Sequence, residues 1–110
     1  MAIPHAASGE LIDVRPLGAS LPTTRSSTLV RANHLEVLRL VLPAGKAAPD
    51  HKAAGAITIQ CLEGSAEFEA YGRTQIMHPG CMVYLSDAAP HSVKALEDCS
   101  LLVTILLRRA

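Results

Sequence analysis

Apolar and polar side chains alternate along much of the chain with the period of two that is typical of half-buried strands. The clearest stretch is 66–71, Ala-Glu-Phe-Glu-Ala-Tyr, in which acidic residues separate apolar ones. A second stretch, 35–42, is rich in Leu and Val and is followed by Pro43 and Gly45. Further short apolar runs cover 57–62, 74–77, 82–85, 91–95 and 100–107. The pattern predicts short strands joined by turns, and it favours no helix with an apolar face.

The turn-forming residues are spread evenly, at intervals of roughly 8 to 12 residues, which is the rhythm of a small sandwich or barrel. The chain has seven glycines and seven prolines. Its 110 residues correspond to one domain. We expect an N-terminal strand and an irregular, dimer-associated arm over 1–27, followed by a barrel over 28–110.

The composition of the chain argues against two classes of partner, nucleic acids and membranes. Ten basic and ten acidic residues cancel, and aromatic residues make up only 3% of the chain, so we expect no nucleic-acid partner. The longest apolar run, 101–107, is far shorter than the roughly 20 residues of a membrane-spanning helix, so we expect no membrane partner either. The N-terminus lacks the pattern of a secretion signal, and the three cysteines form no CxxC pair. These features predict a cytoplasmic protein with reduced thiols.

Two histidines lie in stretches with a recognisable spacing. Gly45, His51 and Gly64 are spaced as in the first conserved motif of the cupin family, G-x5-H-x-H-x3,4-E-x6-G, and this stretch resembles it. The middle of the motif differs, because Ala53 occupies the position of the second histidine and Ile57 that of the glutamate. The resemblance therefore carries only one of the three metal ligands of this motif.

The second cupin motif, G-x5-P-x-G-x2-H-x3-N, is similar to the stretch that runs from Gly80 through His91. Ser86, Ala88 and Ala95 stand where the motif has proline, glycine and asparagine. Together the two stretches imply an all-β fold, namely a single-domain cupin jelly-roll barrel of about ten short antiparallel strands.

In the cupin family three histidines and one glutamate hold a divalent metal inside the barrel, and the resemblance carries over only His51 and His91. Two imidazoles hold Zn, Fe, Ni or Mn weakly unless another ligand completes the shell. Gln60 is a candidate, but strand alternation directs it away from the face of Ile57 unless a bulge intervenes. Cys61 shares the face of Ile57, although a buried cysteine is more often a small apolar residue.

The predicted pocket also contains side chains other than metal ligands. We expect it to be lined by Ala53, Ile57, Met82, Tyr84 and Arg39. A charge such as Arg39 inside an apolar strand must reach water, pair with a carboxylate or bind an anion. Metal-free members of the wider superfamily use a histidine as base and a tyrosine as acid, roles that the resemblance offers to His91 and Tyr84.

Three functions remain open. The first is binding of a small molecule in the barrel, with or without a weakly held divalent metal. The alternative is a metal-dependent enzyme, a dioxygenase or isomerase, that uses His51 and His91 as ligands. The third is a sensory module that reports ligand occupancy to a partner. Because 101–107 is apolar on both faces, we also predict a homodimer, with 11–31 a candidate to cross to the partner.

Overall fold

The computed structural model describes residues 5–48, 55–86 and 89–107. This part of the chain contains eight strands and one short 3-10 helix. The elements are η1 (Gly18–Thr23), β1 (Ser27–Arg31), β2 (Leu35–Leu42), β3 (Ile57–Glu63), β4 (Ala66–Ala70), β5 (Arg73–Met77), β6 (Met82–Leu85), β7 (His91–Ala95) and β8 (Cys99–Leu106). Seven of these strands cover the runs predicted from the alternation, so that prediction is confirmed. No helix in these ranges is long and apolar enough to cross a membrane.

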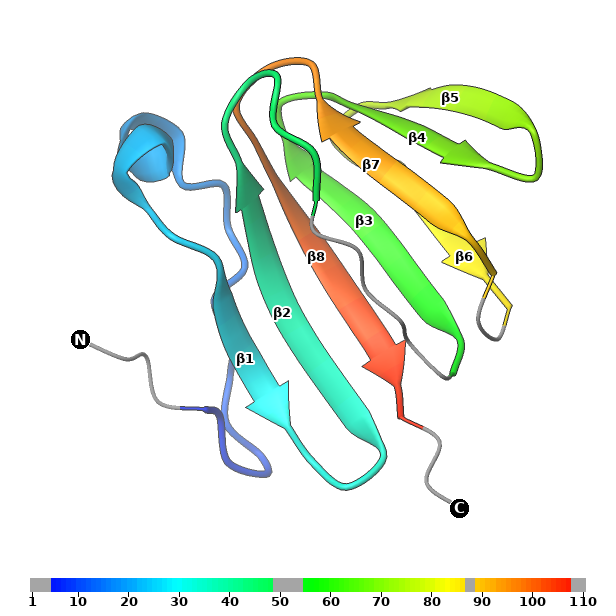
Figure 1. Cartoon of the computed structure of the whole chain (residues 1–110). Coiled ribbons are helices and arrows are strands. Elements are labelled where there is room, and N and C mark those ends of the chain that lie inside the picture. The colour runs from blue at the N-terminus through cyan, green and yellow to red at the C-terminus, as the bar shows by residue number, and fades with distance from the viewer. Residues whose placement is uncertain (1–4, 49–54, 87–88, 108–110) are drawn as a thin grey trace.

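The strands form two antiparallel sheets that face each other (Figure 1). The larger sheet has the order β1-β2-β8-β3-β6 and the smaller has the order β5-β4-β7. Side chains from both sheets, such as Ile59 and Leu101 from the larger and Phe68 and Val93 from the smaller, are buried in one hydrophobic core. This packing is that of a two-layer jelly roll.

The larger sheet has two chemically different faces. Along β3 the buried side chains of Ile57, Ile59 and Cys61 alternate with the half-buried Thr58 and Gln60. We call the face toward the smaller sheet the inner face and the opposite face the outer face. Because side chains alternate along a strand and paired residues share a face, the strand register assigns every position of the larger sheet to one of them.

Residues 5–26, which we call the arm, contain η1 and no strand within that range. The predicted strand before residue 27 is therefore absent from residues 5–26, and the first strand begins at Ser27. The arm is held to its own chain by Glu63, whose carboxylate accepts hydrogen bonds from the backbone N–H groups of Leu17 (2.7 Å) and Gly18 (3.1 Å). The hydroxyl of Ser100 donates a third bond to the same carboxylate, at 2.7 Å.

The turn after β3 explains one glycine of the first motif. Gly64 has a φ of 77°, in the left-handed region that disfavours other residues. A Cβ at this position would lie 2.1 Å from the backbone oxygen of Asp98. Gly64 therefore allows the turn between β3 and β4 to pack directly against the turn between β7 and β8.

Candidate functional site

The inner cavity lies between the two sheets and has a volume of about 50 Å³. Binding sites for organic ligands usually have volumes of about 300–1,000 Å³, so this cavity accommodates only a few molecules of the size of water. Its lining is almost entirely aliphatic. The lining residues are Leu38, Leu40, Ala48, Ile57, Ile59, His91, Val93, Leu101, Val103 and Ile105.

His91 is the polar member of this lining, and its ring is held in one orientation. It is the first residue of β7, and its Nδ1 lies 3.0 Å from the carbonyl oxygen of Ala89. A carbonyl oxygen only accepts hydrogen bonds, so Nδ1 carries the proton and donates it. The ring also stacks on Phe68, with a centroid distance of 6.2 Å and an angle of 30° between the planes. With Nδ1 as the donor, the lone pair of Nε2 in this tautomer is available to a ligand or a metal ion.

The first motif contributes little to this cavity within the described residues. Ile57 lines it, so the position that holds glutamate in the cupin motif presents an aliphatic side chain here. His51 and Ala53, the other predicted positions of this motif, lie outside the described residues. In the described ranges no group of three or more His, Cys, Asp or Glu side chains is placed to hold a metal ion. The lining described here, with one imidazole, does not fit a metal site with three protein ligands.

Gln60 does not reach the cavity, and the prediction that it replaces a missing metal ligand is wrong. It pairs with Met82 on β6 and Leu102 on β8, on the outer face. The irregularity that would have been needed to turn it inward does occur in β3, but it lies between Cys61 and Glu63, after Gln60. Strand alternation is therefore intact at Gln60.

Cys61 does face inward, but it is packed in the core rather than presented to the cavity. Its exposed fraction is 0%, and it is not among the residues that line the cavity. Its sulfur lies 3.6 Å from each of the carbonyl oxygens of Glu63 and Gly64. Burial raises the pKa of the Cys61 thiol. Because only the thiolate is a good metal ligand, this environment disfavours Cys61 as one.

Met82 and Tyr84 lie outside the inner cavity, in contrast to the prediction that they line the pocket. Their exposed fractions are 61% and 68%, and they pair with Gln60 and Thr58 on the outer face. The inward positions of β6 belong to Val83 and the buried Leu85 instead. Tyr84 consequently cannot act as a proton donor beside His91 in the inner cavity.

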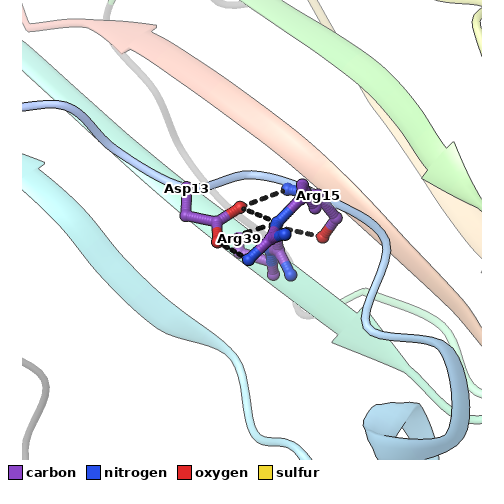
Figure 2. A network of polar contacts seen from close by, with 3 residues as sticks. All are labelled: Asp13, Arg15 and Arg39. Atoms are coloured by element: carbon purple, nitrogen blue, oxygen red, sulfur yellow. Dashed lines mark hydrogen bonds and ion pairs between the residues drawn. The ribbon is translucent and has the colours of Figure 1, made fainter.

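Arg39 is the third correction, because it is buried on the face opposite to the predicted one. Only 6% of Arg39 is exposed, yet its neighbours on β2, Leu38 and Leu40, are the ones that line the inner cavity. Figure 2 shows Arg39 extending from β2 toward Asp13 and Arg15 of the arm, where its Nη2 donates to the carbonyl oxygen of Arg15 at 2.9 Å. The arm, and not the interior of the fold, removes Arg39 from water.

A second and larger hollow, which we call the arm groove, lies beside Arg39. It has a volume of about 450 Å³. Its lining comprises His5, Ala6, Glu10, Leu11, Ile12, Asp13, Leu17, Thr24, Ser27, Leu29 and Arg39. The sequence does not predict this groove, although it contains an arginine within an apolar strand and a long irregular segment before that strand. Nothing in the strand pattern indicates that the two come together.

The fold with its two facing antiparallel sheets is the all-β cupin fold predicted from the two motifs. No protein-family model matches the chain, and no curated protein matches it significantly. Among solved structures, the chain is similar to a conserved protein of unknown function from Streptococcus pyogenes. That likeness has a TM-score of 0.73 and 20% identity, and it covers 100% of this chain and 97% of the other.

Two solved cupins show the same likeness. A cupin superfamily protein from Desulfitobacterium hafniense gives a TM-score of 0.74 at 14% identity, covering 89% of this chain and 95% of the other. An RmlC-like cupin from Desulfovibrio desulfuricans gives 0.66 at 23% identity, covering 93% and 97%. Similarity at these identities establishes the fold, and activity has to be argued from the residues of this chain.

Proposed function

We propose that the chain binds a small ligand in the inner cavity, with His91 as its polar anchor. The observation that carries the proposal is the single fixed imidazole, with Nδ1 bound to the Ala89 carbonyl, in an otherwise aliphatic lining of the described residues. Surroundings of low polarity strengthen any polar contact made inside them. The volume of about 50 Å³ limits the ligand, or the part of it that enters, to a few heavy atoms.

A weakly held divalent metal, namely Zn, Fe, Ni or Mn, is part of this proposal and depends on His51. The described lining supplies one nitrogen ligand, and His51 would supply the second. Two imidazoles leave at least two positions of a tetrahedral ion to water or ligand atoms, so the affinity is expected to be low. No catalytic step is derived through such a metal.

The alternative function is that of a metal-dependent enzyme with His51 and His91 as ligands. The observation that favours it is structural similarity to HppE, which was solved with Fe(II) and substrate. That similarity has a TM-score of 0.65 at 19% identity, and it covers 74% of this chain and 52% of the other. The aliphatic residue at Ile57, where the cupin motif has a ligand, makes simple binding the better-supported function.

Metal content and metal titration of the tag-free protein test the proposal. We expect Zn²⁺ to bind the wild type with micromolar or weaker affinity, and His51→Ala and His91→Ala each to weaken binding at least tenfold. His78→Ala is the matched control, because His78 is exposed in the turn after β5. Equal Zn²⁺ binding by all three variants would refute the metal part of the proposal.

A second experiment tests the ligand site itself. Amide NMR spectra of the wild type and of His91→Ala are recorded with and without small polar solutes. If the substitution changes neither the amide signals of the cavity residues nor their response to the solutes, the ligand site is refuted.

We also propose that the chain forms a homodimer through the outer face of β3, β6 and β8. Met82, Tyr84 and Leu106 are exposed there by 61%, 68% and 52%. The register places them beside Thr58 and Thr104, and this part of the face is uncharged, whereas Glu63 at the end of β3 lies on the same face and is bonded to the arm. A neutral apolar face can pair with its own copy about a two-fold axis without opposing like charges. A monomer in sedimentation at tens of micromolar would contradict this.

The remaining proposals concern the cellular location of the protein and its binding partners. All three cysteines, Cys61, Cys81 and Cys99, are free thiols. Reduced thiols are typical of reducing compartments, which supports a cytoplasmic location. We propose small-molecule ligands and a second copy of the chain as partners, and neither nucleic acid nor membrane. Fractionation of the native host and thiol counting in the purified protein test the location, and the location is wrong if the native cysteines are oxidised.

A further inference from the structure

The arm groove has the dimensions of a ligand site. Its volume of about 450 Å³ falls within the range of about 300–1,000 Å³ that is usual for small-molecule sites. Leu11, Ile12, Leu17 and Leu29 give it apolar walls, and Arg39 lies at its base on β2. The groove is on the outer face of the larger sheet, so it is separate from the inner cavity and does not depend on the function proposed there.

Arg39 brings to this groove a positive charge that acts on Asp13 and Glu63 from a distance, since it lowers the pKa of both carboxyl groups. Only 6% of Arg39 is exposed, and burying a charged group costs free energy of folding unless the charge is paired. Within the described residues it makes no ion pair, and its assigned hydrogen bond is that from Nη2 to the carbonyl of Arg15. A guanidinium has five N–H donors. No fully buried side-chain nitrogen in the described residues lacks a partner, so any donor of Arg39 without a partner keeps some contact with solvent, and Arg39 is among the residues that line the groove.

The carboxylates near Arg39 are already engaged by other donors. Asp13 forms an ion pair with Arg15 at 2.8 Å, as Figure 2 shows, and Glu10 accepts from the backbone N–H of Ala7. Glu63 accepts from two backbone N–H groups of the arm and from Ser100. The groove therefore combines apolar walls with a guanidinium that makes no direct ion pair in the part of the chain that the structure describes. Glu10 and Asp13 at its rim add negative charge, which disfavours ligands with more than one negative charge.

We propose that the arm groove binds a small organic monocarboxylate with an unbranched apolar chain. The carboxylate accepts hydrogen bonds from the guanidinium of Arg39 in the planar geometry that arginine favours, and the chain lies against Leu11, Leu17 and Leu29. This assigns Arg39 the anion-binding role that a charged residue in an apolar strand suggests, but on the outer face and beneath the arm.

Amide NMR titration of the full chain with butanoate, hexanoate and octanoate tests the proposal. We expect shifts at Leu11, Leu17, Leu29 and Arg39 and none at Ile57 or Val93, with affinity rising about threefold for each added methylene. Hexan-1-ol, which has the same chain without the charge, is expected to bind at least tenfold more weakly than hexanoate. Inorganic phosphate, which has charge without a chain, is expected to cause no saturable shifts. Equal binding of alcohol and acid, or shifts centred on Ile57 and Val93, would overturn the proposal.

Two pairs of variants complete the test. Arg39→Gln is expected to weaken hexanoate binding at least tenfold, and Arg39→Lys less. Because Arg39 also contacts the arm, Leu11→Glu provides an independent test. Leu11 is fully exposed, so the change adds a negative charge at the groove without removing a packed side chain. We expect it to weaken hexanoate binding at least fivefold, whereas the control Leu96→Glu, at a 44% exposed position elsewhere, leaves it unchanged.

The variants also separate this site from the one proposed for the inner cavity. Hexanoate binding that survives His91→Ala and is lost in Leu11→Glu supports the arm groove whether or not His91 binds a ligand. Hexanoate binding that is lost in His91→Ala and unaffected by Leu11→Glu would overturn the arm groove as the carboxylate site.

Discussion

The two faces of the larger sheet are made by the same strands but differ in what they hold. On β2, Leu38 and Leu40 point into a cavity of about 50 Å³, while Arg39 between them points to a groove of about 450 Å³. The inner face is packed by aliphatic side chains and leaves one imidazole beside a small space. Around Arg39 the outer face is covered by the irregular arm, which leaves a groove beside it. Of these two hollows the larger lies outside the sandwich, under the arm, and the charge of Arg39 lies there with it.

The exposed fraction of a residue does not show on which face of the sheet the residue lies. Arg39 and Ile57 are almost equally buried, at 6% and 5% exposed, yet they lie on opposite faces of the sheet. Ile57 is buried by the second sheet, whereas Arg39 is buried by the arm through the carbonyl of Arg15. A low exposed fraction therefore shows that a residue is covered. The strand register shows on which face of the sheet it lies, and the contacts on that face show which segment covers it.

The largest expected effect contrasts neighbouring leucines on the two faces. Leu101 is fully buried in the core, whereas Leu102 beside it faces outward and is partly exposed. We expect Leu101→Ala to lower the free energy of unfolding by about 2–5 kcal/mol, and Leu102→Ala by about 1 kcal/mol or less. Urea denaturation measures both. Equal losses would show that the outer face is as well packed as the inner one, and a loss at Leu102 that depends on protein concentration would indicate a second copy on that face.

A smaller effect is expected when the link between arm and sheet is weakened. Glu63→Gln removes the charge from an acceptor of three hydrogen bonds. We expect it to lower the free energy of unfolding by about 1–2 kcal/mol and to speed proteolysis within the arm. Glu67→Gln, on β4 of the other sheet, is the control. If both variants lose the same stability, Glu63 has no special part in holding the arm.

The same contact predicts a pH dependence. Partial burial raises the pKa of Glu63, but the hydrogen bonds from Leu17, Ser100 and Gly18 and the charge of Arg39 outweigh it, so the pKa lies below its usual range. A carboxyl group with a lowered pKa stabilises the fold fully above about pH 4.3, and this stability is lost as the pH falls through the folded-state pKa. We expect amide exchange at Leu17 and Gly18 to accelerate over that acidic range in the wild type. Glu63→Gln should show no such step.

The smallest effect is expected at the residues that the structure removed from the pocket. Tyr84→Ala and Met82→Ala replace side chains that are mostly exposed on an edge strand. We expect each to change the stability of the monomer by less than about 0.5 kcal/mol and to leave metal binding unchanged. In the dimer each should weaken association. A loss of metal binding in Tyr84→Ala would contradict the placement of this residue on the outer face.

The candidate site was only partly predictable from the sequence. Alternation placed Ile57 on the inner face and directed Gln60 outward, and the spacing of the second motif drew attention to His91. The faces of Tyr84 and Met82 could not be predicted by counting residues back from His91, because the loop between β6 and β7 interrupts the strand alternation. Only the pairing of β6 with β3, in which Tyr84 lies opposite Thr58, assigns both residues to the outer face. Pairing between distant strands is not encoded in the pattern of either strand alone.

The sequence by itself determined that this chain is all-β, where most of its strands begin and end, and that it has the cupin fold. The strands were predictable because a period of two, punctuated by glycine and proline, depends on local geometry and on the separation of apolar from polar side chains. The cupin fold followed from the resemblance of the two motif stretches to the cupin motifs, and not from the periodicity. Only the tertiary structure decided which side of β2 Arg39 occupies, and that the arm rather than the core covers it. Both depend on contacts between residues far apart in the chain, such as that of Glu63 with Leu17 and Gly18, and no local pattern specifies them.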